Sequence, residues 1–203
     1  MEINMYKLAR AAIVIAFMAL LSGCVASYSI KSESNVVPQP DEETAVVVFM
    51  RSSFILSGVS MNLYEKAGDE LSFVGTMIDR SKVAHRTTPG KKVFMTHATA
   101  PDFMVADLEA NKTYYVIVRP IWPSRFAPTP VRTDGTTAFN TSSEKFVGWR
   151  DLTDLYEIAE TAEPWFSKEK ENIQKIYDAG WAVFEQKTDE QKQERTLRAS
   201  DGI

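Results

Sequence analysis

Cysteine is almost absent from this chain, because the 203 residues include a single one, Cys24. An intramolecular disulfide is therefore excluded, and a folded domain has to depend on a hydrophobic core. The composition permits such a core, since 44% of the residues are hydrophobic. Histidine is also scarce, with only His85 and His97. One cysteine and two histidines are few ligands for a zinc site, so we predict no metal site.

Motifs for nucleotide binding and catalysis are missing as well. The nine glycines are scattered, and the Pro89–Lys92 turn lacks the spacing of a phosphate-binding loop. Ser81, His85 and Asp107 supply the residue types of a catalytic triad, but no G-x-S-x-G elbow accompanies them. We therefore predict no catalytic residues.

The chain has no large net charge of either sign, because it contains 23 basic and 27 acidic residues and its net charge is −4. Binding to nucleic acid requires a basic surface that neutralises phosphates. We therefore expect no nucleic-acid partner.

Charged residues are also missing between Arg10 and Lys31. Residues 11–21 in this gap are all apolar and follow Lys7 and Arg10, which is the pattern of a secretory signal peptide. The alternative is an uncleaved transmembrane helix, which the length of the gap permits. The second half of the gap is more polar, however, because it contains Ser22, Ser27, Tyr28 and Ser29. We therefore predict a signal peptide over residues 1–23.

The apolar run ends in Leu21, Ser22, Gly23 and Cys24, a sequence that resembles the lipobox of bacterial lipoproteins. The resemblance implies cleavage before Cys24 and acylation of its thiol. Several acyl chains on one residue would hold the protein stably on a membrane. Covalent lipid is then the only cofactor we expect. Val25 follows the cysteine where aspartate would favour inner-membrane retention, so the resemblance implies an outer-membrane location facing the periplasm in a Gram-negative cell.

The segment after the lipobox is rich in serine and contains Pro38 and Pro40, a composition that favours a flexible tether over residues 24–44. Residues 45–120 then alternate short runs of Val, Phe, Tyr and Thr with turn residues, which predicts a small antiparallel β-sandwich or barrel. Within it, residues 46–50 read as a central strand that is buried on both faces. Residues 61–65 and 71–77 read as a hairpin with Leu71, Phe73, Gly75 and Met77 on one face.

Four segments of this part resemble the DUF2846-like β domain, a bacterial lipoprotein family to which no activity is assigned. The segments are Val46–Arg51, Ser60–Tyr64, Thr88–Lys91 and Leu108–Val116. The chain departs from the family pattern with Thr88 for a proline, Lys92 for a histidine and Asn111 for a glycine. The resemblance implies a β fold and a location in the cell envelope.

The back half is expected to be partly helical, which gives a mainly β fold with added α structure. Residues 121–150 contain three prolines and predict an irregular connector. Residues 151–203 predict a helical segment, with one helix to about Ala162, a second amphipathic helix carrying Phe166 to Phe184, and a polar tail that frays.

All four tryptophans lie in this back half. Trp165 and Trp181 share the helical spacing of a core, whereas Trp122 and Trp149 lie outside it and are candidates for an interaction surface. The alternative is that all four fill the seam between the helices and the sandwich.

We predict a non-enzymatic envelope lipoprotein that contacts another envelope protein or the cell wall. The alternatives are a periplasmic carrier or sensor of a small hydrophobic ligand held in that seam, and, less favoured, an envelope hydrolase using His85 or His97.

Overall fold

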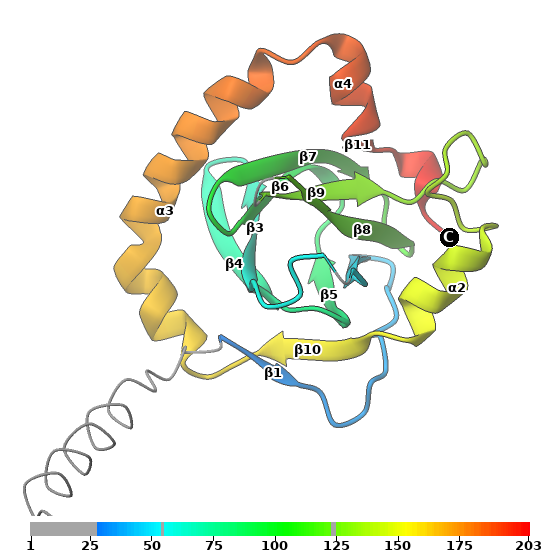
Figure 1. Cartoon of the computed structure of the whole chain (residues 1–203), viewed down its shortest axis with the longest axis horizontal. Helices are drawn as coiled ribbons and strands as arrows, with labels where there is room; N and C mark the ends of the chain where they lie inside the picture. The colour runs from blue at the N-terminus through cyan, green and yellow to red at the C-terminus, as the bar shows by residue number, and fades with distance from the viewer. Residues whose placement is uncertain (1–27, 54, 123–124) are drawn as a thin grey trace, which may run out of the picture.

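The computed structural model describes residues 28–53, 55–122 and 125–203, which form two packed β-sheets wrapped by helices (Figure 1). The first sheet has the spatial strand order β1 (Ser29–Lys31), β10 (Asp154–Ile158), β5 (Ser81–Thr87), β2 (Ala45–Arg51), β8 (Thr113–Ile121) and β9 (Arg125–Pro130). The second sheet has the order β11 (Thr196–Leu197), β7 (Pro101–Leu108), β6 (Gly90–His97), β3 (Met61–Ala67) and β4 (Glu70–Met77). The predicted class, mainly β with a C-terminal helical part, is confirmed, and the two sheets make a sandwich rather than a closed barrel.

The main hydrophobic core lies between the two sheets. Phe49 of β2 packs there against Phe94 of β6, with ring centroids 5.0 Å apart. All seven residues of β2 are buried, because β2 lies between β5 and β8 and both of its faces are covered. The predicted central strand is therefore confirmed. The pairing is more mixed than predicted, since β2 with β8, β10 with β5 and β11 with β7 are parallel pairs.

The predicted hairpin is present as β3 and β4, but its predicted single face is wrong. Leu71 and Phe73 belong to the cluster on the outer side of the second sheet, whereas Met77 belongs to the core between the sheets. The pairing register shifts between Leu63 and Tyr64, so β4 carries a bulge that transfers its apolar side chains from one face to the other. Gly75, with a φ of 153°, occupies this irregular stretch.

Helix α3 (Ala162–Glu185) covers the outer face of the second sheet (Figure 1). Its buried residues are Ala162, Phe166, Ile173, Tyr177 and Phe184, which confirms the predicted amphipathic helix. Gly180 allows α3 to approach β7 closely, because a Cβ atom there would lie 2.5 Å from Cγ of Pro101.

The predicted tether over residues 24–44 is wrong for the part that the structure describes. Strand β1 pairs antiparallel with β10, and the buried Ser29 Oγ accepts a hydrogen bond of 2.7 Å from the Thr76 amide. Asn35 Oδ1 accepts another of 2.7 Å from the Leu155 amide. Composition misses this arm because its stability comes from pairing with β10, more than 120 residues away, rather than from its own apolar content.

Three further predictions for the back half are wrong. The connector over 121–150 contains β9 and helix α2 (Glu144–Asp151), which Ser143 caps. The helix expected from residue 151 is replaced by strand β10, which long-range pairing with β5 and β1 stabilises. The tail expected to fray contains α4 (Asp189–Glu194), β11 paired with β7, and a 3-10 turn at Ala199–Asp201.

Candidate functional site

The predicted lipidation motif, Leu21 to Cys24, lies outside the residues that the structure describes. Within the described ranges, no helix combines the length and the apolar character needed to cross a membrane. The described part of the chain also holds no group of three or more metal-ligating side chains. The candidate sites of the folded domain are therefore a hairpin tip, a groove and two polar clusters.

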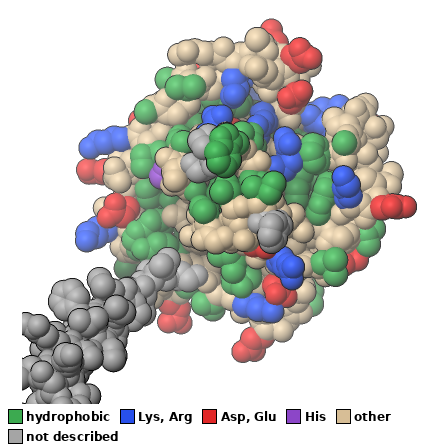
Figure 2. Space-filling model, viewed as in Figure 1, with side chains coloured by type: hydrophobic (Ala, Val, Ile, Leu, Met, Phe, Trp, Pro, Cys, Tyr) green, Lys and Arg blue, Asp and Glu red, His purple; other side chains and the backbone are tan. Residues whose placement is uncertain are grey.

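The hairpin tip is the turn between β8 and β9, where Trp122 follows the last residue of β8. Trp122 is 85% exposed, the largest fraction among the described large hydrophobic side chains. Figure 2 shows hydrophobic side chains gathered near the centre of one face of the molecule, with acidic side chains mostly at the rim. A tryptophan side chain at this exposure leaves a large apolar area in contact with water, and exposed aromatic side chains are characteristic of binding surfaces.

A second exposed apolar residue, Ile55, lies at the same end of the sandwich and is 62% exposed. Its loop is held by Arg51 at the end of β2, which donates hydrogen bonds of 2.6 Å to the carbonyl oxygens of Leu56 and Val59. The Arg51 guanidinium also lies 4.3 Å from the ring centroid of Phe126, which pairs with Pro120 near the tip. The buried Arg51 thus fixes this loop beside the base of the hairpin.

The other tryptophans are less accessible than Trp122. Trp149 of α2 is half-buried and packs against the outer face of the first sheet, with Phe139 at a centroid distance of 6.0 Å. Trp165 and Trp181 pack in the seam between α3 and the second sheet. Of the two tryptophans predicted as an interaction surface, only Trp122 is fully displayed.

A groove runs between α3 and the adjacent ends of β3 and β6, with a volume of about 310 Å³. Its polar lining includes Asn62, His97, Glu169 and Asn172, and Trp165 contributes an aromatic wall. Burial lowers the pKa of His97, so its imidazole is neutral at pH 7. The mixed lining differs from the purely apolar pocket that a hydrophobic ligand prefers.

The other histidine belongs to a buried polar cluster that joins the two sheets. His85 of β5 pairs through Nε2 with the carboxylate of Glu65 of β3. Thr87 Oγ1 donates a 2.7 Å hydrogen bond to the same carboxylate, and Lys92 Nζ lies 3.6 Å from it. Burial alone would raise the pKa of Glu65, but these three partners outweigh it and the pKa is lowered. The Ser81 hydroxyl instead donates to the Ile78 carbonyl oxygen, so it is committed to a turn.

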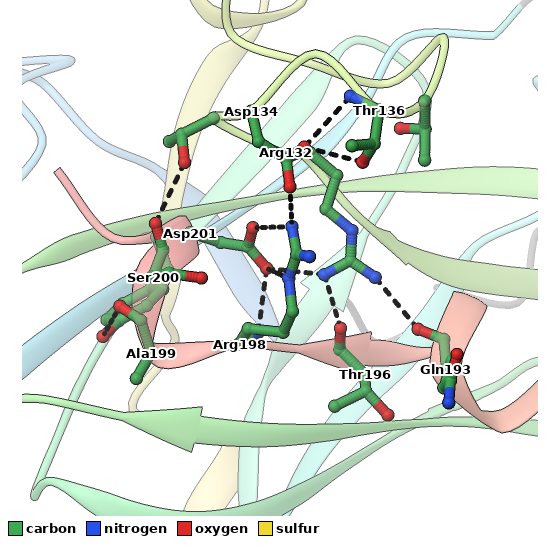
Figure 3. Close-up of polar contacts among 12 residues, drawn as sticks. Arg132, Asp134, Thr136, Gln193, Thr196, Arg198, Ala199, Ser200 and Asp201 are labelled. Atoms are coloured by element: carbon green, nitrogen blue, oxygen red, sulfur yellow. Dashed lines mark hydrogen bonds and ion pairs between the residues drawn. The ribbon is translucent and has the colours of Figure 1, made fainter.

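The second polar cluster ties the C-terminal segment to the loop after β9 (Figure 3). Arg132 Nη1 donates to Asp201 Oδ2 at 2.5 Å and to the Thr196 carbonyl oxygen at 2.6 Å. Arg198 bridges Asp201 and Asp134, at 2.8 and 2.7 Å. Hydrogen bonds from Thr136 and then from Arg198 hold the pKa of Asp134 well below its usual range. Sequence reasoning missed this cluster because its partners are more than 60 residues apart.

No protein-family model matches the chain, and no curated protein matches it either. Among solved structures, an NMR structure of a protein from Eubacterium rectale is similar over 44% of this chain and 89% of that one. The two are 9% identical and the TM-score is 0.34, so this likeness carries no argument about fold or function.

Proposed function

We propose that this protein is a bacterial envelope lipoprotein, anchored through lipid on Cys24, whose folded domain is a non-enzymatic interaction module. The lipobox-like sequence Leu21–Cys24 supports the anchor, and the resemblance to the DUF2846-like β domain supports the envelope location. The exposed Trp122 is the observation that favours an interaction module.

The chemistry of the hairpin tip suits a protein or cell-wall partner. An indole has few rotamers to freeze and buries a large area, so one tryptophan can contribute much of a binding free energy. Trp122 is presented on a hairpin whose strands are paired over six residue pairs, from Val116 with Pro130 to Ile121 with Arg125. The backbone that precedes Trp122 is therefore held by the paired strands.

The anchor is tested by Cys24→Ser in the native host. We expect the variant to stay unprocessed and to leave the membrane fraction, because serine cannot form the thioether to lipid. Ser27→Ala, which leaves the lipobox unchanged, is the matched control. Unaltered processing and membrane attachment of Cys24→Ser would refute the lipoprotein proposal.

The interaction surface is tested by placing a photo-crosslinking amino acid at position 122 in intact cells. We expect a discrete adduct with an envelope component, and loss of its co-purification with Trp122→Ala. Leu152, which is 76% exposed and follows α2, provides the control position and the control variant Leu152→Ala. Absence of an adduct at 122, or the same adduct at 152, would contradict the assignment.

A ligand carrier is the second candidate, because the groove beside α3 is open and contains Trp165. Its polar lining favours a polar or amphipathic ligand over a purely hydrophobic one. Ile176→Trp would fill the groove, so this function predicts that Ile176→Trp abolishes complementation of a deletion strain while Trp122→Ala does not. The reverse pattern supports the interaction module. The hydrolase alternative predicts loss of function when both His85 and His97 are changed to alanine in a variant that still folds.

A further inference from the structure

The position of the first described residue, Tyr28, restricts how the domain can sit on a membrane. The Tyr28 ring stacks on Trp165 at the start of α3, with centroids 3.9 Å apart and an interplanar angle of 15°. Its carbonyl oxygen accepts a 3.0 Å hydrogen bond from the Ala159 amide. The chain is therefore fixed to the folded domain from Tyr28 onward.

Only a short stretch separates this fixed point from the lipidation residue. Cys24 and Tyr28 are four residues apart. Even a fully extended chain spans at most about 14 Å over that separation. A compact domain of this size is about 40 Å across. The reach of this connection is much smaller than the diameter of the domain, so Tyr28 has to remain near the bilayer surface. Most orientations of the domain relative to the bilayer are therefore excluded.

We infer that the face formed by Tyr28, Trp165, β1 and β10 rests against the lipid bilayer; this inference depends on the proposed anchoring through Cys24. Exposed apolar side chains flank this edge of the first sheet, where β1 is the outermost strand. Ile30 of β1 is 55% exposed and Ile158 of β10 is 50% exposed, and the pairing register places their side chains on opposite sides of the two strands. Tyrosine and tryptophan beside them are the residues that favour the boundary between water and lipid.

The charges on this face indicate which kind of bilayer it fits. Lys31 pairs with Asp154 at 2.8 Å, and Glu157 accepts a 2.6 Å hydrogen bond from Ser32. Glu160 and Glu163 are exposed nearby, between β10 and the first turn of α3. The surface thus lacks the excess of lysine and arginine that anionic lipids attract. A leaflet with zwitterionic headgroups is the partner that matches it.

This orientation also determines which surface of the domain points away from the bilayer. Helix α4, β11 and the C-terminus lie across the molecule from the start of β1 (Figure 1). The cluster of Arg132, Asp134, Arg198 and Asp201 therefore faces away from the membrane. Ala138, an exposed residue of the adjoining loop, marks that far side.

The inference is tested by depth-dependent quenching on the lipidated full chain. Acylation of Cys24 removes the only native thiol, so a single new cysteine can carry a fluorophore, either in Ile158→Cys or in the matched variant Ala138→Cys. Each labelled protein is reconstituted in phosphatidylcholine vesicles that contain nitroxide-labelled lipid. We expect several-fold stronger quenching at 158 than at 138. Equal quenching, or stronger quenching at 138, overturns the inference.

A second variant tests whether chain length sets this orientation. Insertion of twenty Gly and Ser residues after Val25 adds a root-mean-square reach of about 25 Å. We expect the protein to stay on the vesicles while quenching at 158 falls towards the value at 138. Unchanged quenching would overturn the role of the short connection. Failure of the uninserted protein to float with the vesicles would instead contradict the lipid anchor itself, which separates the two proposals.

Discussion

At the residue scale, Glu65 shows how burial and pairing oppose each other within one side chain. Its carboxylate is nearly inaccessible, yet His85, Thr87 and Lys92 keep its pKa below the ordinary value. Neither His85 nor Glu65 could be assigned to this cluster from the sequence, because the two residues occupy strands of different sheets. Trp122 was easier to identify, since an isolated tryptophan among turn residues has no helical or strand periodicity that would bury it.

The Glu65 cluster makes stability depend on pH. The folded-state pKa lies below the unfolded-state value, which is about 4.3. The pairing energy is therefore fully present above pH 4.3 and is lost as the pH falls through the folded-state pKa. We expect Glu65→Gln to lower the free energy of unfolding at pH 7 by about 3 kcal/mol, because it leaves the buried Lys92 ammonium without its counter-ion. The difference from the wild type should shrink on acidification.

Urea denaturation at neutral and acidic pH measures this effect. Asp69→Asn, in the exposed turn between β3 and β4, is the matched control and should leave the pH profile unchanged. A Glu65→Gln variant that is as stable as the wild type at pH 7 would show that the cluster does not stabilise the fold.

At the element scale, the local sequence pattern predicted the helices and strands whose own apolar spacing matches the face that they bury. It failed for segments whose conformation is set by pairing with a strand far away in the sequence. Strand β2 and helix α3 each carry their apolar residues at the spacing of the final structure. Strand β10 was predicted as a helix because Leu155, Tyr156 and Ala159 fit helical spacing, whereas pairing with β5 and β1 makes the segment extended. Trp122 was predicted as a candidate residue, and the seam between the helices and the sandwich was named as an alternative ligand site. The residues that line the groove could not be predicted, because they meet only where α3 crosses the sheet.

Alanine is expected to have different effects at Gly180, which lies at the contact between α3 and β7, and at Gly148, which lies in α2. Alanine at Gly180 would place Cβ 2.5 Å from Pro101 Cγ and 2.9 Å from Phe103 Cε2. We expect Gly180→Ala to destabilise the protein by about 1–3 kcal/mol through overpacking, despite the higher helix propensity of alanine. Gly148→Ala in α2 meets only Leu152 at 4.0 Å and should be neutral or stabilising. Equal urea midpoints for both variants would contradict this account of the seam.

The Arg132 and Asp201 pair predicts how the C-terminal segment is held. Both side chains are almost inaccessible, so Asp201→Ala leaves the Arg132 guanidinium buried without its counter-ion. We expect a loss of about 3–5 kcal/mol and faster hydrogen exchange at Thr196 and Leu197 of β11. Asp134→Ala removes the partner of Arg198 and the acceptor of two Thr136 hydrogen bonds, and it should cost much less because these groups are exposed. Equal losses in the two variants would place the stabilisation outside the buried pair.

At the scale of the whole molecule, the arm over residues 28–36 and the C-terminal residue Ile203 are both bonded to the same sandwich. The Ile203 amide donates to the Thr113 carbonyl oxygen at 3.0 Å, while the arm pairs with β10 on another side of the sandwich. The sequence pattern indicated a flexible tether here because serine and proline are typical of linkers. The distinction matters for function, since a tether would lift the domain away from lipid and a docked arm holds it close.

These two descriptions of the arm predict different stabilities for shortened soluble chains. A chain that starts at residue 28 keeps every contact of the arm. One that starts at residue 37 loses the hydrogen bonds of Tyr28, Ser29, Ser32 and Asn35 to the sandwich. Tyr28, Ser29 and Asn35 each lose one of these bonds and Ser32 loses two. At about 1 kcal/mol for each hydrogen bond, we expect the shorter chain to be less stable by about 5 kcal/mol in urea denaturation. A flexible tether would contribute nothing, so equal stabilities would restore the linker interpretation and remove the structural basis for a bilayer-facing surface.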